Sequence, residues 1–219
     1  DRKNGIVICS LEDPAHPKPI AEFTEGVTAG VHSTFIYQQE KFGTHIYLTN
    51  DGTGALHVID ISDPYKPKEV AQWKTDRPDA GRSLHDIDLR DGLLYASYWN
   101  DGLVILDVGS GIKGGSPEKP QFVSQLRMNY HELYGDGWLA GAHAVFRYKN
   151  YVFIGDEVFP AIFDIQSKNR IPVRGIVHVV DVSDINNPRK VAEYTVPEGG
   201  AHNIWVKDDV LSMGYYSGG

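Results

Sequence analysis

The chain has 219 residues, of which 41% are hydrophobic and 23% are charged, and these values are ordinary for a folded domain. Its formal net charge of −8 argues against a nucleic-acid partner, because phosphate binding requires a basic surface. The single cysteine, Cys9, excludes an internal disulfide framework, and no apolar run approaches the roughly 20 residues that a membrane-spanning helix needs. We therefore predict no transmembrane segment, so that membrane association would arise only through a partner or a missing terminus.

The sequence is organised around one repeated strand. Residues 55–64 read Ala-Leu-His-Val-Ile-Asp-Ile-Ser-Asp-Pro, an aliphatic run that ends in an Asp-Pro turn. The pattern returns at residues 102–108 and 176–184, and a weaker copy with Ser10 in place of the aspartate opens the chain at residues 5–14. Short aliphatic and β-branched runs bounded by turn residues are typical of β-strands, so we predict the same strand four times.

Each copy belongs to a unit of four short strands. A strand that opens with a histidine and a strand that ends in a polar-glycine turn precede the repeated strand, and a strand that starts after a proline follows it. The histidine-led strands are predicted at residues 31–37, 84–89, 142–147 and 201–206. The second strands are predicted at residues 46–52, 94–102, 152–156 and 211–218. The proline-led strands are predicted at residues 19–23, 67–73, 120–126 and 188–194. No helical pattern is present, so we predict an all-β fold in which four-stranded antiparallel sheets are the blades of a β-propeller.

The predicted strands form a single propeller domain over residues 1–219. They begin with the third strand of a blade and end with the second strand of another, which makes about four blades' worth of strands. A four-bladed ring that mixes both termini in one blade would fit this order. The abrupt end at Gly219 instead favours a domain that is incomplete at its C-terminus and is part of a larger ring.

The repeated strand with its Ser-Asp-Pro tail resembles the LVIVD-repeat family of β-propellers. The best matches are residues 56–64, 103–108 and 177–184, and the resemblance extends over essentially the whole chain. It implies a propeller and an extracytoplasmic location, which means periplasmic, secreted or on the cell surface. A fold by itself does not imply an activity.

Polar residues also recur within the repeated strand. Asp60, Asp107 and Asp181 end it at matching positions, and we expect these carboxylates to cap the following turns rather than to catalyse a reaction. His57 and His178 occupy matching positions inside the strand, where we expect partly exposed side chains.

Four histidines are the main candidates for a site. His32, His85, His143 and His202 open the innermost strands at intervals of 53, 58 and 59 residues, so we expect them around the axis near one face. Neutral imidazoles that converge there could hold one Fe, Cu or Zn ion. A metal-dependent oxidoreductase with an axial four-histidine site is therefore the alternative function.

A structural role would explain the same histidines. Each imidazole could hydrogen-bond to the turn residue of its own blade, since a repeated blade repeats its buried polar pairs. The expected partners, in chain order, are Asp51, Asp101, Asp156 and Ser217. The aspartates would also orient the imidazoles if a metal were bound. We prefer the structural role, which implies no catalytic residue and no cofactor.

Two insertions in the repeat, residues 128–141 and 157–175, are rich in apolar and aromatic side chains. Long loops on a regular scaffold commonly carry binding function. The candidate partner-binding residues in them are Tyr130, His131, Tyr134, Trp138, Phe159 and Phe163. We therefore predict a non-catalytic module that binds or scaffolds a protein partner, is exported and is a subunit of a larger assembly.

Overall fold

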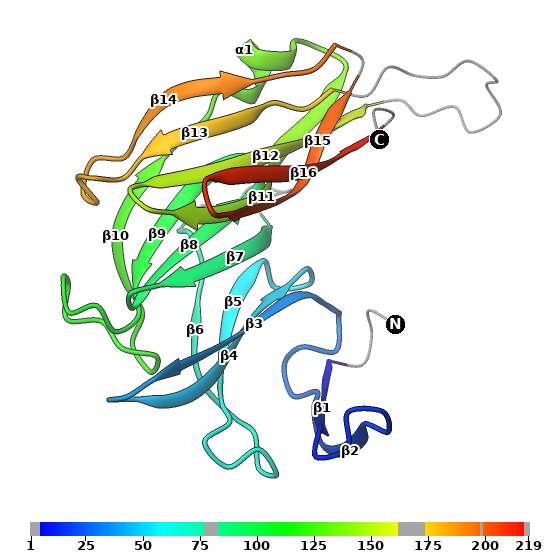
Figure 1. Ribbon diagram of the computed structural model, residues 1–219, viewed down its shortest axis with the longest axis vertical. Coiled ribbons are helices and arrows are strands. Elements are labelled where there is room, and N and C mark those ends of the chain that lie inside the picture. The colour runs from blue at the N-terminus through cyan, green and yellow to red at the C-terminus, as the bar shows by residue number, and fades with distance from the viewer. Residues whose placement is uncertain (1–4, 77–82, 162–173, 198, 217–219) are drawn as a thin grey trace, which may run out of the picture.

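The structure is a computed structural model that describes residues 5–76, 83–161, 174–197 and 199–216. These residues form sixteen β-strands, one α-helix and one short 3-10 helix, so the predicted all-β class is confirmed. The strands make three four-stranded and two two-stranded sheets, all antiparallel (Figure 1). No helix among the described residues is long and apolar enough to cross a membrane.

Each four-stranded sheet is a meander in which strands pair in chain order. The first contains β3 (Val31–Gln39), β4 (Gly43–Asn50), β5 (Ala55–Asp60) and β6 (Lys68–Trp73). The second contains β7 (Leu84–Arg90), β8 (Leu93–Tyr98), β9 (Gly102–Asp107) and β10 (Gln121–Leu126). The third contains β11 (Trp138–Tyr148), β12 (Tyr151–Pro160), β13 (Val177–Asp181) and β14 (Arg189–Tyr194). The two-stranded sheets pair β1 (Ile6–Ser10) with β2 (Lys18–Phe23), and β15 (Gly200–Lys207) with β16 (Val210–Tyr216).

The repeated strand ends in the same turn in all three four-stranded sheets. The Oδ1 atoms of Asp60, Asp107 and Asp181 each accept a hydrogen bond from the backbone N–H two residues later, at 2.8, 2.9 and 2.8 Å. An aspartate that bonds the backbone two residues on stabilises a turn locally. The prediction that these residues cap turns is confirmed.

Successive sheets pack face to face along the chain. Apolar side chains of the first and second sheets form one buried cluster that includes Tyr47, Leu56 and Leu94. A second cluster, which includes Ile105 and Ile154, joins the second and third sheets. Smaller clusters attach β1–β2 to the first sheet and β15–β16 to the third. The core is therefore a series of interfaces between neighbouring repeats, as expected for a repeat protein.

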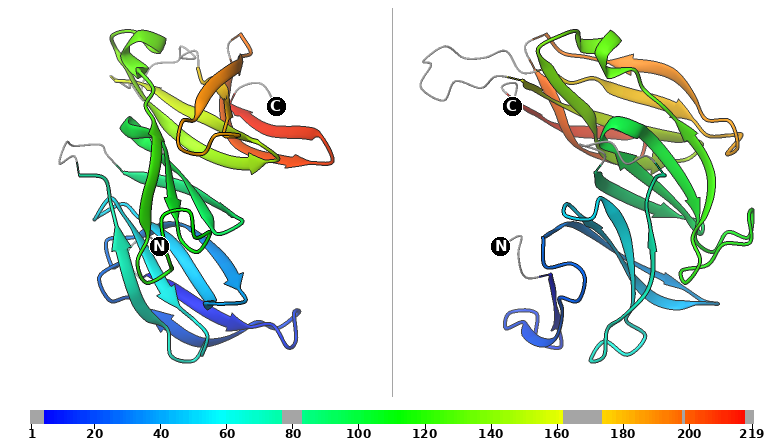
Figure 2. Two further views of the ribbon diagram at one scale, coloured as in Figure 1. Left: turned by 90° about the vertical axis from the view of Figure 1, so that its left-hand side faces the viewer. Right: turned by 180° about the vertical axis from the view of Figure 1, so that it is seen from behind.

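The described sheets form an open fan rather than a closed ring (Figures 1 and 2). The first strands of four successive sheets, β3, β7, β11 and β15, lie side by side on its inner edge (Figure 1). Polar side chains join neighbouring inner strands: Asp86 and Asp88 of β7 accept hydrogen bonds from the backbone N–H groups of Val145 and Arg147 of β11, at 3.4 and 2.8 Å. This inner edge is the part of the fold on which the predicted histidines lie.

The insertion before β11 contains the helix α1 (Tyr130–Tyr134), so the prediction that no helix forms is wrong. The Asn129 side chain accepts a hydrogen bond from the Glu132 N–H, and Gly135 ends the helix with φ of 77°. A single helical turn has too few residues to show a helical period in the sequence. In the sequence, only the two capping residues, Asn129 and Gly135, indicate this helix.

Candidate functional site

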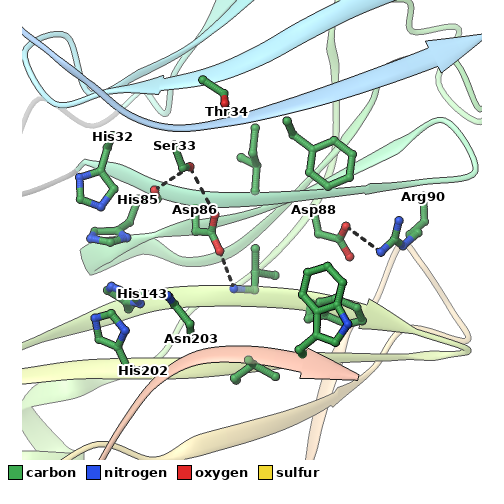
Figure 3. Close-up of a pocket in the computed structure, with 16 residues that line it drawn as sticks. His32, Ser33, Thr34, His85, Asp86, Asp88, Arg90, His143, His202 and Asn203 are labelled. Carbon is green, nitrogen blue, oxygen red and sulfur yellow. Dashed lines mark hydrogen bonds and ion pairs between the residues drawn. The ribbon is translucent and has the colours of Figure 1, made fainter. Parts of the chain in front are cut away.

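The four inner strands line a cavity of about 650 Å³. Figure 3 shows the leading histidines at one end of this cavity and Arg90 at the other, with Asp86 and Asp88 between them. All sixteen lining residues belong to β3, β7, β11 and β15. The cavity therefore brings together four segments that are far apart in the sequence.

Each leading histidine lies at an irregularity in strand pairing. The register shifts between Val31 and Thr34 in β3 and between Ala201 and Ile204 in β15. In β7 the shift skips His85, and in β11 it skips His143. A β-bulge of this kind leaves a residue unpaired and redirects its side chain, and bulges are frequent next to active sites. This repeated bulge explains how the histidines all come to face the cavity.

The four imidazoles lie in a row, which we call the histidine ladder (His32, His85, His143 and His202). The ring centroids of successive members are 4.1, 4.0 and 4.0 Å apart, with interplanar angles of 61, 40 and 43°. Figure 3 shows the rings one above another along the edge of the cavity. The four histidines lie together, as the sequence predicts, but successive rings are edge-on or tilted to one another, and only His85 and His143 belong to a group with closely spaced ligand atoms.

Glu157 joins the middle of the ladder. Its Oε2 atom lies 3.8 Å from Nε2 of His85 and 3.8 Å from Nε2 of His143. Among the described residues, these three side chains make up a group whose potential metal-ligand atoms all lie within 4.8 Å of one another. Two of the four predicted ligands therefore converge with a carboxylate that sequence reasoning missed. Glu157 is the first residue of the second insertion, and nothing in its local sequence distinguishes it.

The interior of the ladder favours neutral imidazoles. Burial lowers the pKa of His143 to about 2, with further lowering by the nearby imidazoles of His85, His202 and His32. Burial and His32 also lower the pKa of His202. Desolvation disfavours the charged form of histidine, and adjacent histidines repel one another when protonated. His143 is thus held in the form that binds metal ions through nitrogen.

The three candidate aspartates have different surroundings. Asp51 lies near its predicted partner, with Oδ2 at 3.7 Å from Nδ1 of His32. Asp101 accepts a hydrogen bond from the Thr75 hydroxyl at 3.0 Å.

Asp156 does not pair with His143 as expected. Its Oδ2 atom instead accepts hydrogen bonds from the Tyr134 hydroxyl at 2.6 Å and from Nε2 of His178 at 2.7 Å. Ser217, the expected partner of His202, lies outside the described residues.

The histidines of the repeated strand, His57 and His178, make the buried hydrogen bonds within a sheet that we expected of the leading histidines. His57 and His178 are fully buried, so the prediction of partly exposed side chains is wrong. Nε2 of His57 is 2.9 Å from the Thr53 hydroxyl, and its Nδ1 is 2.5 Å from Oε1 of Glu69 in the next strand. His57 shares a strand face with Ile59, and His178 shares one with Val180, and these faces pack against the preceding sheet. Packing between repeats therefore buries both histidines, which the sequence of a single strand does not reveal.

The partner-binding candidates divide into buried and exposed residues. Tyr134 is only 7% exposed and bonds to Asp156, so it belongs to the interior. Tyr130 and Trp138 are half-buried, the latter beneath the Arg174 guanidinium, which is 4.7 Å from its ring centroid. His131 is exposed. Phe163 lies outside the described residues.

An exposed apolar surface borders the ladder, and we call it the apolar lip (Trp99, Leu139 and Phe159). Leu139 and Phe159 are opposite each other where β11 and β12 extend four residues beyond their predicted limits, and they are 56% and 41% exposed. The Trp99 ring stacks on Phe159 with 6.2 Å between centroids, and it lies 5.7 Å from the ring of His85. Sequence reasoning identified Phe159 but missed Leu139 and Trp99.

These observations define a repeat protein of four-stranded antiparallel β-sheets. The family model of the LVIVD repeat matches residues 46–75 and 81–112, which cover most of the first two complete sheets. The predicted resemblance is therefore confirmed: these two units are LVIVD repeats. No curated protein matched the chain.

Proposed function

We propose that the protein is a non-catalytic β-propeller module that binds a protein partner through the apolar lip. The four-stranded sheets would be blades, and residues 1–219 would form one domain within a larger ring. The open fan and the cavity along its inner strands support this arrangement, because propeller blades surround a central channel in the same way.

The observation that carries the binding proposal is the extension of β11 and β12. It places Leu139 and Phe159 on one face, exposed and backed by Trp99. Gly141 permits this packing, since a Cβ atom there would lie 2.4 Å from the Trp99 ring. Rigid aromatic and aliphatic anchors on ordered elements are typical of the centres of protein interfaces.

The proposal includes a location outside the cytoplasm and membership of a larger assembly. The LVIVD resemblance supports the location, and the exposed apolar lip supports membership of an assembly. Fractionation of cells that make the full-length protein tests the location. Recovery in the cytoplasmic fraction would contradict it.

Site-specific photocrosslinking in the native cell tests the binding surface. A photoreactive residue at Leu139 is expected to give one defined protein adduct, and Phe159→Asp should abolish that adduct. The matched control places the same group at Val191 of β14, which is 52% exposed but is not part of the lip. No adduct at Leu139, or the same adduct from Val191, would refute the proposal.

A further inference from the structure

We propose that His85, His143 and Glu157 form a binding site for one divalent transition-metal ion. The site lies in the middle of the histidine ladder, at the mouth of the cavity. It is independent of the proposed protein partner, and either proposal can fail without the other.

The distances are close to those that a metal requires. Zn²⁺ bonds nitrogen and carboxylate oxygen at about 2.0–2.2 Å, so two ligand atoms in a tetrahedral site are about 3.4 Å apart. The Glu157 oxygen is 3.8 Å from each of the two nitrogens. All three ligand atoms lie within 4.8 Å of one another, so a bound ion would draw them closer together.

The donor set suits a transition metal better than Mg²⁺ or Ca²⁺. Two imidazole nitrogens and one carboxylate oxygen occur both in zinc sites that keep an open position and in non-haem iron sites. Magnesium and calcium prefer oxygen ligands. The cavity that His85 and His143 line leaves space for an additional ligand such as water.

The surroundings prepare the ligands. The His143 side chain is 7% exposed and that of Glu157 is 12% exposed, which holds both in restricted positions.

The same geometry argues against one site made by all four histidines. Ligands of a single ion must lie within about 4.4 Å of one another, which is twice the longest metal–ligand bond. The group that meets a similar limit contains His85 and His143, whereas His32 and His202 are one ladder step further out on either side. His32 and His202 are therefore matched controls, since they are of the same residue type in the same ladder.

The experiment is a titration of the tag-free, metal-depleted full chain with Zn²⁺, measured by isothermal titration calorimetry. Binding of Co²⁺, followed by its visible absorption spectrum, reports the ligand set independently. We expect one equivalent of metal for the wild type. His143→Ala and Glu157→Gln are expected to weaken binding at least about 100-fold, because loss of a ligand should cost no less than loss of a residue that supports one.

Glu157→Gln has nearly the same shape as the wild type and keeps the proposal testable if His143→Ala misfolds. His32→Ala and His202→Ala are expected to change the affinity less than about threefold. Absence of stoichiometric binding by the wild type would overturn the proposal. Unchanged metal affinity of Glu157→Gln would also overturn it. So would losses of affinity in His32→Ala and His202→Ala as large as that in His143→Ala, because they would indicate a site made from the whole ladder.

Discussion

Asp107→Asn should destabilise the fold strongly, because Asp107 accepts five backbone hydrogen bonds at the end of β9. Its Oδ1 atom accepts from the N–H groups of residues 109–111 at 2.9, 2.8 and 3.3 Å. Its Oδ2 atom accepts from those of Lys113 and Gly115 at 2.7 and 3.0 Å. Asparagine keeps one acceptor oxygen but turns an NH₂ group toward two of these donors. An unpaired buried donor costs about 1–3 kcal/mol, so we expect a loss of about 2–4 kcal/mol.

Asp181→Asn is the matched control at the same position of the next sheet. Its Oδ1 atom accepts the turn bond from Ser183, which an asparagine oxygen can retain. We therefore expect a loss below about 1 kcal/mol. Urea unfolding followed by circular dichroism measures both variants, with equal m-values as the condition for comparing midpoints. Equal losses in the two variants would refute the reasoning.

The same carboxylate has a predicted pH dependence. Burial raises the pKa of Asp107, but the backbone N–H groups of the turn outweigh burial and hold this pKa well below its usual range. In the unfolded chain the Asp107 carboxyl has the higher pKa, about 3.9, so the unfolded chain binds the proton first as the pH falls. The stabilisation by Asp107 is therefore complete above about pH 4 and is lost below it. Between about pH 4 and pH 2, the wild type should lose stability more steeply than Asp107→Asn.

Two further predictions concern the surroundings of the site, and the first has a matched control. Tyr134→Phe is expected to lower the free energy of unfolding by about 2 kcal/mol in urea, because the buried Asp156 carboxylate loses a donor. Tyr95→Phe should change it little, since no described group bonds the Tyr95 hydroxyl, and a similar loss there would contradict the reasoning. Gly141→Ala would place a Cβ atom 2.4 Å from the Trp99 ring, so we expect a loss of about 1–3 kcal/mol and an altered near-ultraviolet circular dichroism spectrum. An unchanged spectrum would show that Trp99 does not pack against Gly141.

Strand positions could be predicted from the sequence because their signals are local. Aliphatic runs, turn residues and prolines recur in each unit, and every strand overlaps with a predicted one. The turn bonds of Asp60, Asp107 and Asp181 are local too, since each spans two residues. Burial is different: His57 and His178 look like half-exposed strand residues in the sequence, but packing against the preceding sheet buries them.

The sequence by itself determined the repeat, the all-β class and the common location of His32, His85, His143 and His202. Only the tertiary structure decided that these rings lie in a row at a tilt to one another, that Glu157 meets two of them and that Asp156 bonds elsewhere. The physical reason is that a repeat specifies equivalent positions, whereas the direction of a side chain depends on bulges and on strand register. A shift of one residue sends a side chain to the opposite face of a sheet, and that shift is set by packing between segments far apart in the chain.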